Sequence, residues 1–532
     1  MSMIAETAPQ AAPRAPLATP LFRALWIATI VSNVGTWMND VGSSWLMTSL
    51  SPSPLWVAMV QAATTLPMFL FALPGGALAD VVDRRKLLLA SQVLILMGAT
   101  ALATTTALAL TTPLILLALT AVMGLGAALS APAFQAIVPE LVERPALADA
   151  VALNSLGVNI ARAIGPALGG IIVAMAGPTA VYALNAVSIL AVLGVLFAWK
   201  RQPTTGALTP EHFLGALRAG YRYARHAPAL QLVLLRAVAF FLFSSALWAL
   251  LPLVGRRELG LDAAGYGALL GAMGFGAVLG ALALAKVRKR VSANHLSLAA
   301  SLLFAIATLA LAHAGNAWIA GGVMVLAGLA WITMLSGLNV VAQMAVPSWV
   351  KARALAIYLL VFQGAMTLGS LVWGALASRT DIATALTVAG IALGLATATG
   401  LRFRLPAAGT MDLTPSGHWA EPAVAGQPEA DRGPVMILIE YRIEPGQVPD
   451  FIKAIQPFRA IRKRDGALFW NVFEDAADPG LVIESFVVPS WLEHLRQHER
   501  ITHDDRLTQD QIRRFHIGET PPRVRHLIAP SS

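Results

Sequence analysis

The chain of 532 residues contains no cysteine and few charged residues, since Asp, Glu, Lys and Arg together make up only 13% of it. The lack of cysteine excludes disulfide bonds and thiolate metal sites. Scarce charge, a hydrophobic content of 57% and a mean hydropathy of +0.67 exclude a soluble globular chain of this length. Most of the chain is therefore expected to lie in lipid.

A glycine-rich nucleotide loop followed by Lys and Ser or Thr is also missing, which disfavours ATP-driven activity. Residues 1–404 carry a net charge of +13 and residues 405–532 a net charge of −4. The basic residues of the first part lie in short connectors between apolar runs. This pattern favours membrane topology over nucleic-acid binding as their cause.

The apolar runs predict an all-α membrane protein with about twelve transmembrane helices, at roughly 20 residues per crossing. The expected spans lie near 22–46, 54–78, 86–110, 112–132, 151–175, 178–199, 230–254, 265–285, 293–314, 317–341, 354–377 and 382–402. The pattern Q-x-x-V-P-x-x-V-x-x-x-A-L-A occurs at Gln135–Ala148 and again 208 residues later, at Gln343–Ala356. This repeated connector indicates two copies of one six-helix unit, an organisation typical of transporters.

The connectors also predict the orientation of the chain, because Lys and Arg accumulate in cytoplasmic loops. Only Arg256, Arg257 and Arg379 fall on the side opposite to the other basic connectors. Both termini are therefore expected in the cytoplasm.

Composition divides the chain further. Residues 1–20 are rich in Ala and Pro and read as a disordered tail, and 21–402 form the twelve-helix part, with halves of about 21–200 and 229–402. The connector 200–229 is basic, and 403–431 reads as a flexible linker. Residues 432–532 predict a small α+β domain of order β-α-β-β-α-β, the ferredoxin-like arrangement.

The connector GALADVVDRRK after the second span resembles the signature G-x-L-a-D-r-x-G-r-k of the major facilitator superfamily. The resemblance implies a cytoplasmic gate in which a guanidinium and a helix N-terminus stabilise the Asp carboxylate; its residues here are Gly76, Asp80, Arg84 and Arg85. Val81 and Asp83 depart from the signature. In the second half Leu284 replaces Asp80, so a carboxylate latch is expected in the first half only. The alternative is a basic cluster that only fixes topology.

The fifth span contains RAIGPALGG, which resembles the antiporter motif of exporters in this superfamily. Its candidate residues are Arg162, Gly165, Pro166, Gly169 and Gly170. Proline bends a helix and glycine permits close backbone approach, so the alternative is tight helix packing without export.

A closer resemblance is to the branch of bacterial enterobactin-type and macrolide-type exporters, the transmembrane secretion effectors, and it covers nearly all of residues 20–402. It is carried by SNVGTWM with WLM, LADAVALNSLGVNIARAIGPALGG, YALNAVSIL, NVVAQMAVPSWVKARALAIY and LGSLVWG. The resemblance implies a multi-pass protein of the bacterial inner membrane that exports small molecules.

Asp40 is the acidic residue placed well inside a span, where a carboxylate is costly unless it is protonated, paired or wetted. It shares a helix face with Asn33 and Trp37. We interpret this face as a cavity wall with Asp40 as a proton carrier. The alternative is an Asp40 near the outer interface or in a structural pair.

Other intramembrane side chains leave two interpretations open. By resemblance, Arg162 serves either packing or cavity electrostatics; the alternative is that it attracts an anionic substrate. Arg236, near the end of the seventh span, is expected to snorkel to the interface. A set of large apolar residues predicts core or lipid-facing positions, with a cavity wall as the alternative: Phe240, Phe241, Phe243, Trp248 and Met334.

The last 100 residues resemble the dimeric ferredoxin-like domains of the antibiotic-biosynthesis monooxygenase group, through RDGALFWNVFED, FVVPSWLEHLRQHER and VRHLI. That resemblance implies dimerisation through the sheet. His494, His498 and His503 suggest a metal site, but without a clear third ligand they are better interpreted as a solvated helix face.

Together these patterns predict a proton-coupled exporter of small amphiphilic molecules, such as drugs or siderophores, that works by alternating access. It needs a small-molecule substrate, protons and a bilayer, and no cofactor, metal or nucleic acid. One alternative is a transporter fused to a ligand-sensing or monooxygenase-like domain. A second alternative is an importer.

Overall fold

The computed structural model describes residues 15–199, 213–406, 411–419 and 431–530, with a few residues between 420 and 430. The side chains of residues 77, 80, 81, 144, 213–217 and 285 are not described. Most of the expected tail at 1–20, the connector residues 200–212, part of the 403–431 linker and the side chain of Asp80 therefore lie outside the described residues.

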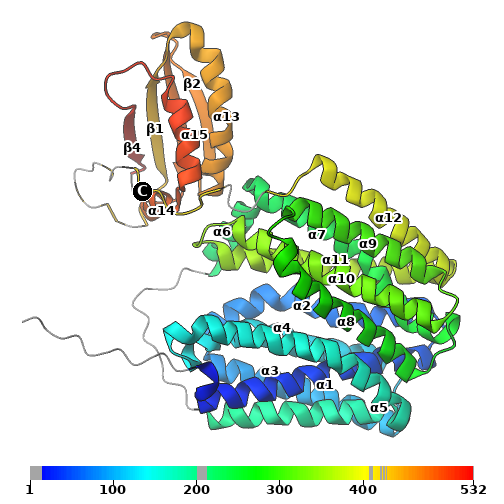
Figure 1. Cartoon of the computed structure of the whole chain (residues 1–532). Helices are drawn as coiled ribbons and strands as arrows, with labels where there is room; N and C mark the ends of the chain where they lie inside the picture. The colour runs from blue at the N-terminus through cyan, green and yellow to red at the C-terminus, as the bar shows by residue number, and fades with distance from the viewer. Residues whose placement is uncertain are drawn as a thin grey trace, which may run out of the picture.

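Long helices make up most of the described chain and lie side by side in one bundle (Figure 1). Their bounds are α1 (Pro20–Leu50), α2 (Pro54–Val81), α3 (Arg84–Ala107), α4 (Pro113–Leu141), α5 (Leu147–Ala198), α6 (Phe213–His226), α7 (Pro228–Leu253), α8 (Ala263–Val287), α9 (Ala293–Ala312), α10 (Ala317–Met344), α11 (Lys351–Arg379) and α12 (Ile382–Arg402).

Ten helices of the described chain are long and apolar enough to cross a membrane. One of them, α5, has 52 residues, and Gly177 interrupts its helical backbone at φ 77°, so that α5 supplies two crossings. α1, with 31 residues, completes twelve crossings, although its polar residues make it less apolar than the others. The predicted twelve-helix membrane fold in two sets of six is confirmed.

The helices begin where the sequence supplies capping groups. α2, α4 and α7 start on a proline, whose missing N–H is not needed in the first turn. The side chains of Asp83, Asp262 and Asp381 accept hydrogen bonds from backbone N–H groups in the first turns of α3, α8 and α12. Asp83, which departs from the superfamily signature, thus caps α3.

The two halves, α1–α5 and α7–α12, meet towards one end of the bundle. The start of α1, α6 and the C-terminal domain lie at the other end, which we call the terminal end (Figure 1). At the opposite end Ser378 of α11 accepts a hydrogen bond from the Leu55 N–H of α2 at 2.9 Å. Deeper in the bundle, the hydroxyls of Thr65 and Thr367 join the same two helices at 2.7 Å.

The same end is closed by contacts between α1 and the start of α8. The rings of Trp45 and Tyr266 stack with centroids 5.8 Å apart. The guanidinium of Arg256 lies over Trp45 and donates to the Thr48 hydroxyl at 2.8 Å. The protein is therefore held shut at the end opposite to the terminal end.

Glycines in α5 allow its close packing against α1 and α8. A Cβ at Gly165 would lie 2.6 Å from the Cβ of Trp37, and one at Gly169 would lie 2.8 Å from the Met38 Cα. On the other side, a Cβ at Gly170 would lie 2.6 Å from the Gly267 Cα of α8. Small residues at these positions let backbones approach where lipid provides little hydrophobic drive for association.

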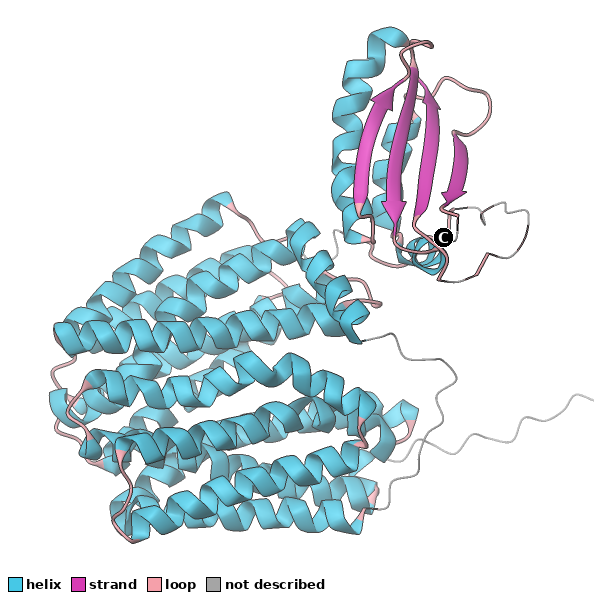
Figure 2. Ribbon diagram, turned by 180° about the vertical axis from the view of Figure 1, so that it is seen from behind, coloured by secondary structure: helices cyan, strands magenta, loops and turns pink. Residues whose placement is uncertain are grey.

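The C-terminal domain comprises β1 (Val435–Arg442), α13 (Val448–Arg464), β2 (Phe469–Glu474), β3 (Leu481–Val488), α14 (Trp491–Arg500), α15 (His503–Arg513) and β4 (Arg523–Ile528). The strands form an antiparallel sheet in the order β2-β3-β1-β4, with Val435 opposite both Val488 and Ile528. Figure 2 shows the helices on one face of the sheet and no element over the other. The order is that of the predicted ferredoxin-like domain, with two helices, α14 and α15, in the second helical segment.

We predict that Gly169→Ala destabilises the protein, because its Cβ would meet the backbone of α1. Overpacking of this kind costs about 1–3 kcal/mol. Gly194→Ala, also in α5, is the matched control, since a Cβ there would meet no atom within 4 Å. The melting temperature of the detergent-solubilised protein should fall by several degrees for Gly169→Ala and hold for Gly194→Ala. Equal melting temperatures would show that α1 and α5 can separate without cost.

Candidate functional site

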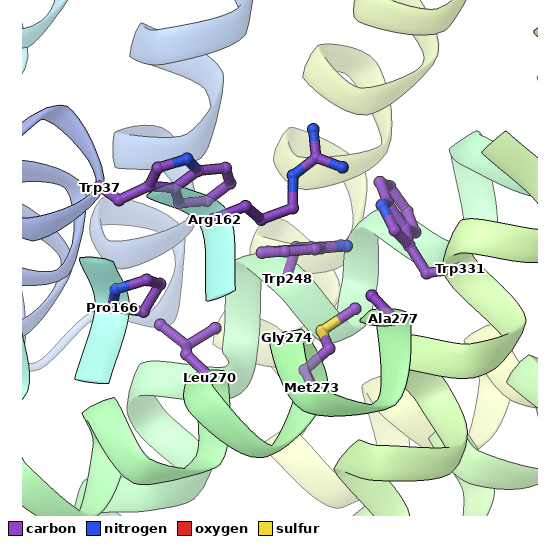
Figure 3. A pocket seen from close by; sticks show the side chains of 9 residues that line it. All are labelled: Trp37, Arg162, Pro166, Trp248, Leu270, Met273, Gly274, Ala277 and Trp331. Atoms are coloured by element: carbon purple, nitrogen blue, oxygen red, sulfur yellow. The ribbon is translucent and has the colours of Figure 1, made fainter. Parts of the chain in front are cut away.

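A recess lies between the two halves near the middle of the bundle (Figure 3). Its cavity volume in this structure is about 20 Å³, so a ligand larger than a water molecule needs the two halves to move apart. The first half contributes Trp37 from α1 and Arg162 and Pro166 from α5. The lining residues from the second half are Trp248 of α7, Leu270, Met273, Gly274 and Ala277 of α8, and Trp331 of α10.

Arg162 supplies the charge of this recess. Its guanidinium lies 5.8 Å from the ring centroid of Trp37 and points between Trp37 and Trp331, above Trp248 (Figure 3). None of the nine lining residues is acidic. The arrangement provides one cation among three indole rings, which suits an amphiphilic ligand better than a metal ion.

The three residues of the predicted cavity face of α1 do not all reach the recess. Trp37 lines the recess, whereas Asn33 and Asp40 are not among its nine lining residues. Asp40 is half-buried one turn beyond Trp37, towards the closed end. Asp40 therefore lies in the closed part of the bundle, beyond the recess.

The basic residues of the expected gate hold the first half together. Arg84 forms an ion pair with Glu140 of α4 at 2.8 Å. Arg85 donates to the backbone oxygens of Leu196 and Phe197 at 2.8 and 2.9 Å, which places a cation at the C-terminus of α5. Glu140, which lies in the first copy of the repeated connector, is a partner that sequence reasoning missed. A Cβ at Gly76 would meet no atom within 4 Å.

The GPALGG segment of α5 borders the recess and lies at the junction of the two halves. Pro166 faces the recess, and its backbone oxygen would lie 2.9 Å from a Cβ at Gly267. This segment therefore packs tightly between the two halves and also borders the recess.

The expectations for two intramembrane side chains, Arg236 and Trp248, were wrong. Arg236 does not snorkel, because it is 4% exposed and donates to Ser297 and to the Phe403 backbone oxygen at 3.2 and 3.1 Å. It ties α7 to α9 and to the end of α12. Trp248 belongs to the cavity wall, whereas Phe240, Phe241 and Met334 are buried core residues. Trp331 was missed, since helical spacing alone does not show which side of α10 faces the seam.

The C-terminal domain is docked on the second half at the terminal end. Glu493 of α14 accepts hydrogen bonds from Arg222 of α6 at 2.9 Å and from Arg500 at 2.7 Å. Burial opposes ionisation of Glu493, but these two cations outweigh it and hold its pKa below the usual range. Arg500 also lies 4.5 Å from the ring centroid of Trp349, in the second copy of the repeated connector.

The part of the 403–431 segment that is described also touches this domain. The Ser416 N–H donates to the Ile501 oxygen at 2.9 Å, and Trp419 donates to the side chain of Gln509 at 2.8 Å. Arg462 lies 4.9 Å from the Trp419 ring and forms a buried ion pair with Glu484 at 2.9 Å.

The histidines of α14 are not a solvated face, which corrects the interpretation of the sequence. His494 is 2% exposed, and its ring lies 5.0 and 4.7 Å from the rings of His498 and His526. Trp491 packs against it, because residues three apart share one side of a helix. His503 lies elsewhere, near Thr414. Among the described residues no group of three His, Cys, Asp or Glu has the arrangement of a metal site.

Burial keeps these histidines neutral. Burial first, and then the neighbouring His526 and His498, lower the pKa of His494 to about 3. Burial, followed by His526 and Arg462, lowers the pKa of His498 to about 4. The folded domain thus excludes protons that an unfolded chain would bind below about pH 6.5.

The fold is that of a membrane transporter of the major facilitator type. A transporter of the POT family, solved with a thioalcohol-conjugated peptide, superposes with a TM-score of 0.60 at 14% identity, over 72% of this chain and 95% of its own. A bacterial homologue of the lysosomal transporter Spinster, in an inward-facing and occupied conformation, gives 0.60 at 15% identity, over 73% and 97%.

The chain belongs to the transmembrane secretion effector family, whose model matches residues 11–532. It is 27% identical over 326 residues to the enterobactin exporter EntS of Salmonella typhi, covering 60% of this chain and 76% of EntS. It is 27% identical over 143 residues to the staphyloferrin A transporter of Staphylococcus aureus, covering 27% of this chain and only 36% of that protein. The chain is a multi-pass membrane transporter.

We predict that the C-terminal domain loses stability as the pH falls from 7.5 to 5. Between these values the unfolded state binds protons that folded His494 excludes, so this residue alone removes about 2 kcal/mol. Pulse proteolysis of the full chain in urea measures the change. His494→Gln should reduce the pH dependence without abolishing it, because buried His498 still excludes a proton, and His503→Gln, at a half-exposed histidine, should leave the pH dependence unchanged. An unchanged slope in His494→Gln would contradict the prediction.

Proposed function

We propose that the protein exports small amphiphilic molecules, of the drug or siderophore kind, across the bacterial inner membrane in exchange for protons. The observation that carries this proposal is the recess lined by both halves at their seam. A site shared between two repeats is accessible from either side in turn when the halves rock against each other. The EntS relatives are enterobactin exporters, which supports export as the direction.

The proposed orientation places the terminal end in the cytoplasm. Connectors at that end hold Arg84, Arg85 and Lys86, in accord with the positive-inside rule. The exceptional Arg256 and Arg257 at the opposite end are engaged by the Thr48 hydroxyl and the Pro52 backbone oxygen. With this orientation the protein is closed to the outside, and substrate reaches the recess from the cytoplasm.

Proton coupling is assigned to Asp40. Its carboxyl group lies one turn from Trp37, next to the contacts of Trp45 and Tyr266 that close the outer end. In such surroundings a carboxylate is costly, whereas opening of this end would hydrate it and release a proton. Proton exchange at Asp40 would thereby be coupled to the outer gate.

We expect Asp40→Asn to lose pH-gradient-driven efflux by at least about tenfold while it keeps gradient-independent exchange, because an amide cannot exchange a proton. The assay uses proteoliposomes and the compound that the wild-type protein exports best from a panel of drugs and siderophores. Asp149→Asn, at an exposed carboxylate in the first turn of α5, is the control. Undiminished coupling in Asp40→Asn would remove Asp40 from the mechanism.

We further propose that the protein dimerises through the open face of its C-terminal sheet. This face carries exposed apolar side chains on three strands, with Met436 beside Leu527 in the register and Phe469 and Phe473 on β2. A contiguous apolar face on a sheet indicates a contact surface. A second copy of the chain presents the same face, so a symmetric pair would bury both apolar faces against each other.

Light scattering of the detergent-solubilised full chain should therefore give a dimer. Phe473→Glu should shift it to a monomer, because a carboxylate would be buried in the contact. Leu507→Glu is the control, since Leu507 is exposed on α15, on the other side of the domain. A wild-type monomer, or dissociation by Leu507→Glu alone, would exclude the sheet contact.

A further inference from the structure

The charge of Arg162 is not neutralised within the recess. The nine lining residues include no carboxylate, and the structure records no ion pair for Arg162 among the residues that it describes. The nearest aromatic partner is Trp37, at 5.8 Å from the ring centroid. A guanidinium held at the seam of two membrane halves without a counter-ion is poised to bind an anion.

The walls around this charge are aromatic. Trp248 and Trp331 pack edge to face, with centroids 5.2 Å apart, and Trp37 lies across the recess from Trp331 (Figure 3). Behind Trp331 the rings of Phe241 and Phe362 lie 5.5 and 6.4 Å from it and fix its position. The recess therefore presents indole faces in a rigid frame, next to one cation.

An unused hydrogen-bond donor lies in the same wall. The indole N–H of Trp248 is buried and has no partner in the described protein. A buried donor without a partner costs free energy, so a ligand that carries an acceptor is favoured at this position. Arg162 and Trp248 thus offer donors from opposite halves of the molecule.

We propose that the ligand of this recess is an aromatic anion: a planar ring that stacks between the indoles and bears a carboxylate or phenolate bound by Arg162. The inference rests on the proposed function in so far as this ligand is the transported substrate. It narrows the proposed substrates, drugs or siderophores, to one chemical class. An anion bridges the halves by joining Arg162 to the Trp248 donor.

Other classes fit the recess less well. A cation would face Arg162 with no carboxylate to balance it, and this repulsion is strong away from water. An aliphatic anion would leave the indole faces without a stacking partner. A neutral aromatic ring would leave the guanidinium desolvated and unpaired.

The test is equilibrium dialysis of the full-length protein in nanodiscs, with empty nanodiscs to correct for partition into lipid. Four compounds of similar size test the effects of charge and of aromaticity separately: 2-naphthoate, its amide, its aminomethyl analogue and decalin-2-carboxylate. We expect 2-naphthoate to bind at least about tenfold more tightly than the other three, since a charge-assisted hydrogen bond is worth roughly ten- to hundredfold in affinity.

Variants identify the groups responsible. Arg162→Gln should reduce 2-naphthoate binding to the level of the amide and leave amide binding unchanged. Arg162→Lys should restore part of the affinity, because it keeps the charge and loses the planar fork. Trp248→Leu should weaken both aromatic ligands. Arg379→Gln is the matched control, since it removes an exposed cation at the closed end. Size-exclusion elution of each variant verifies its fold.

The result that overturns the inference is tighter binding of the cationic or aliphatic compound, or an unchanged preference for 2-naphthoate in Arg162→Gln. Binding is measured without a gradient, so it is independent of coupling and direction. Selective binding without gradient-driven flux supports the inference and contradicts the proposed function. Flux of cationic compounds without naphthoate binding contradicts the inference and supports the proposed function.

Discussion

The packing of α5 against α1 on one side and α8 on the other is the constraint on which the rest of the membrane part depends. Lipid tails are as apolar as leucine, so helices in a bilayer are held by close contact rather than by exclusion of water. Gly165 and Gly169 bring α1 close, and Gly170 with Gly267 brings α8 close. Because Arg162 and Pro166 belong to the same helix, this packing also places the charge and one wall of the recess at the seam. The motif that holds the two halves together thereby positions the site.

The two halves share a scaffold and differ in what fixes their connectors. In the first half Glu140, in the repeated connector, pairs with Arg84. Its counterpart 208 residues later is Ser348, and Arg288, the counterpart of Arg84, donates to Ser336 instead. The second connector carries Trp349, on which Arg500 of the C-terminal domain lies. The first half is thus tied to itself, whereas the second is tied to the appended domain. Movement of the second half during transport would carry that domain with it.

In the C-terminal domain, burial decides which ionisable side chains are neutral and which need a partner. His494 and His498 on an Arg-rich helix suggest solvated side chains, yet the packing of α14 makes them neutral parts of the domain. Glu484 is fully buried, but it is satisfied by Arg462, Trp470 and Tyr441 at 2.9, 2.9 and 3.4 Å. Networks of this kind are stable only when each member has a partner. Among the described residues of this domain, the ring nitrogens of His494 and the side-chain amide of Gln497 are buried without a partner.

The sequence by itself determined the membrane class, the twelve crossings, the duplication and the division between the spans near 151–175 and 178–199, because hydrophobic length and repeated spacing are local properties of a chain. It also identified Arg162, Trp37 and Pro166 as candidates. Only the tertiary structure decided that Trp248 and Trp331 from the other half complete the recess, that Asp40 lies beyond it towards the closed end, and that Arg236 is buried. Helical periodicity defines the faces of one helix but not which neighbour each face meets, and that choice depends on contacts between residues more than a hundred positions apart.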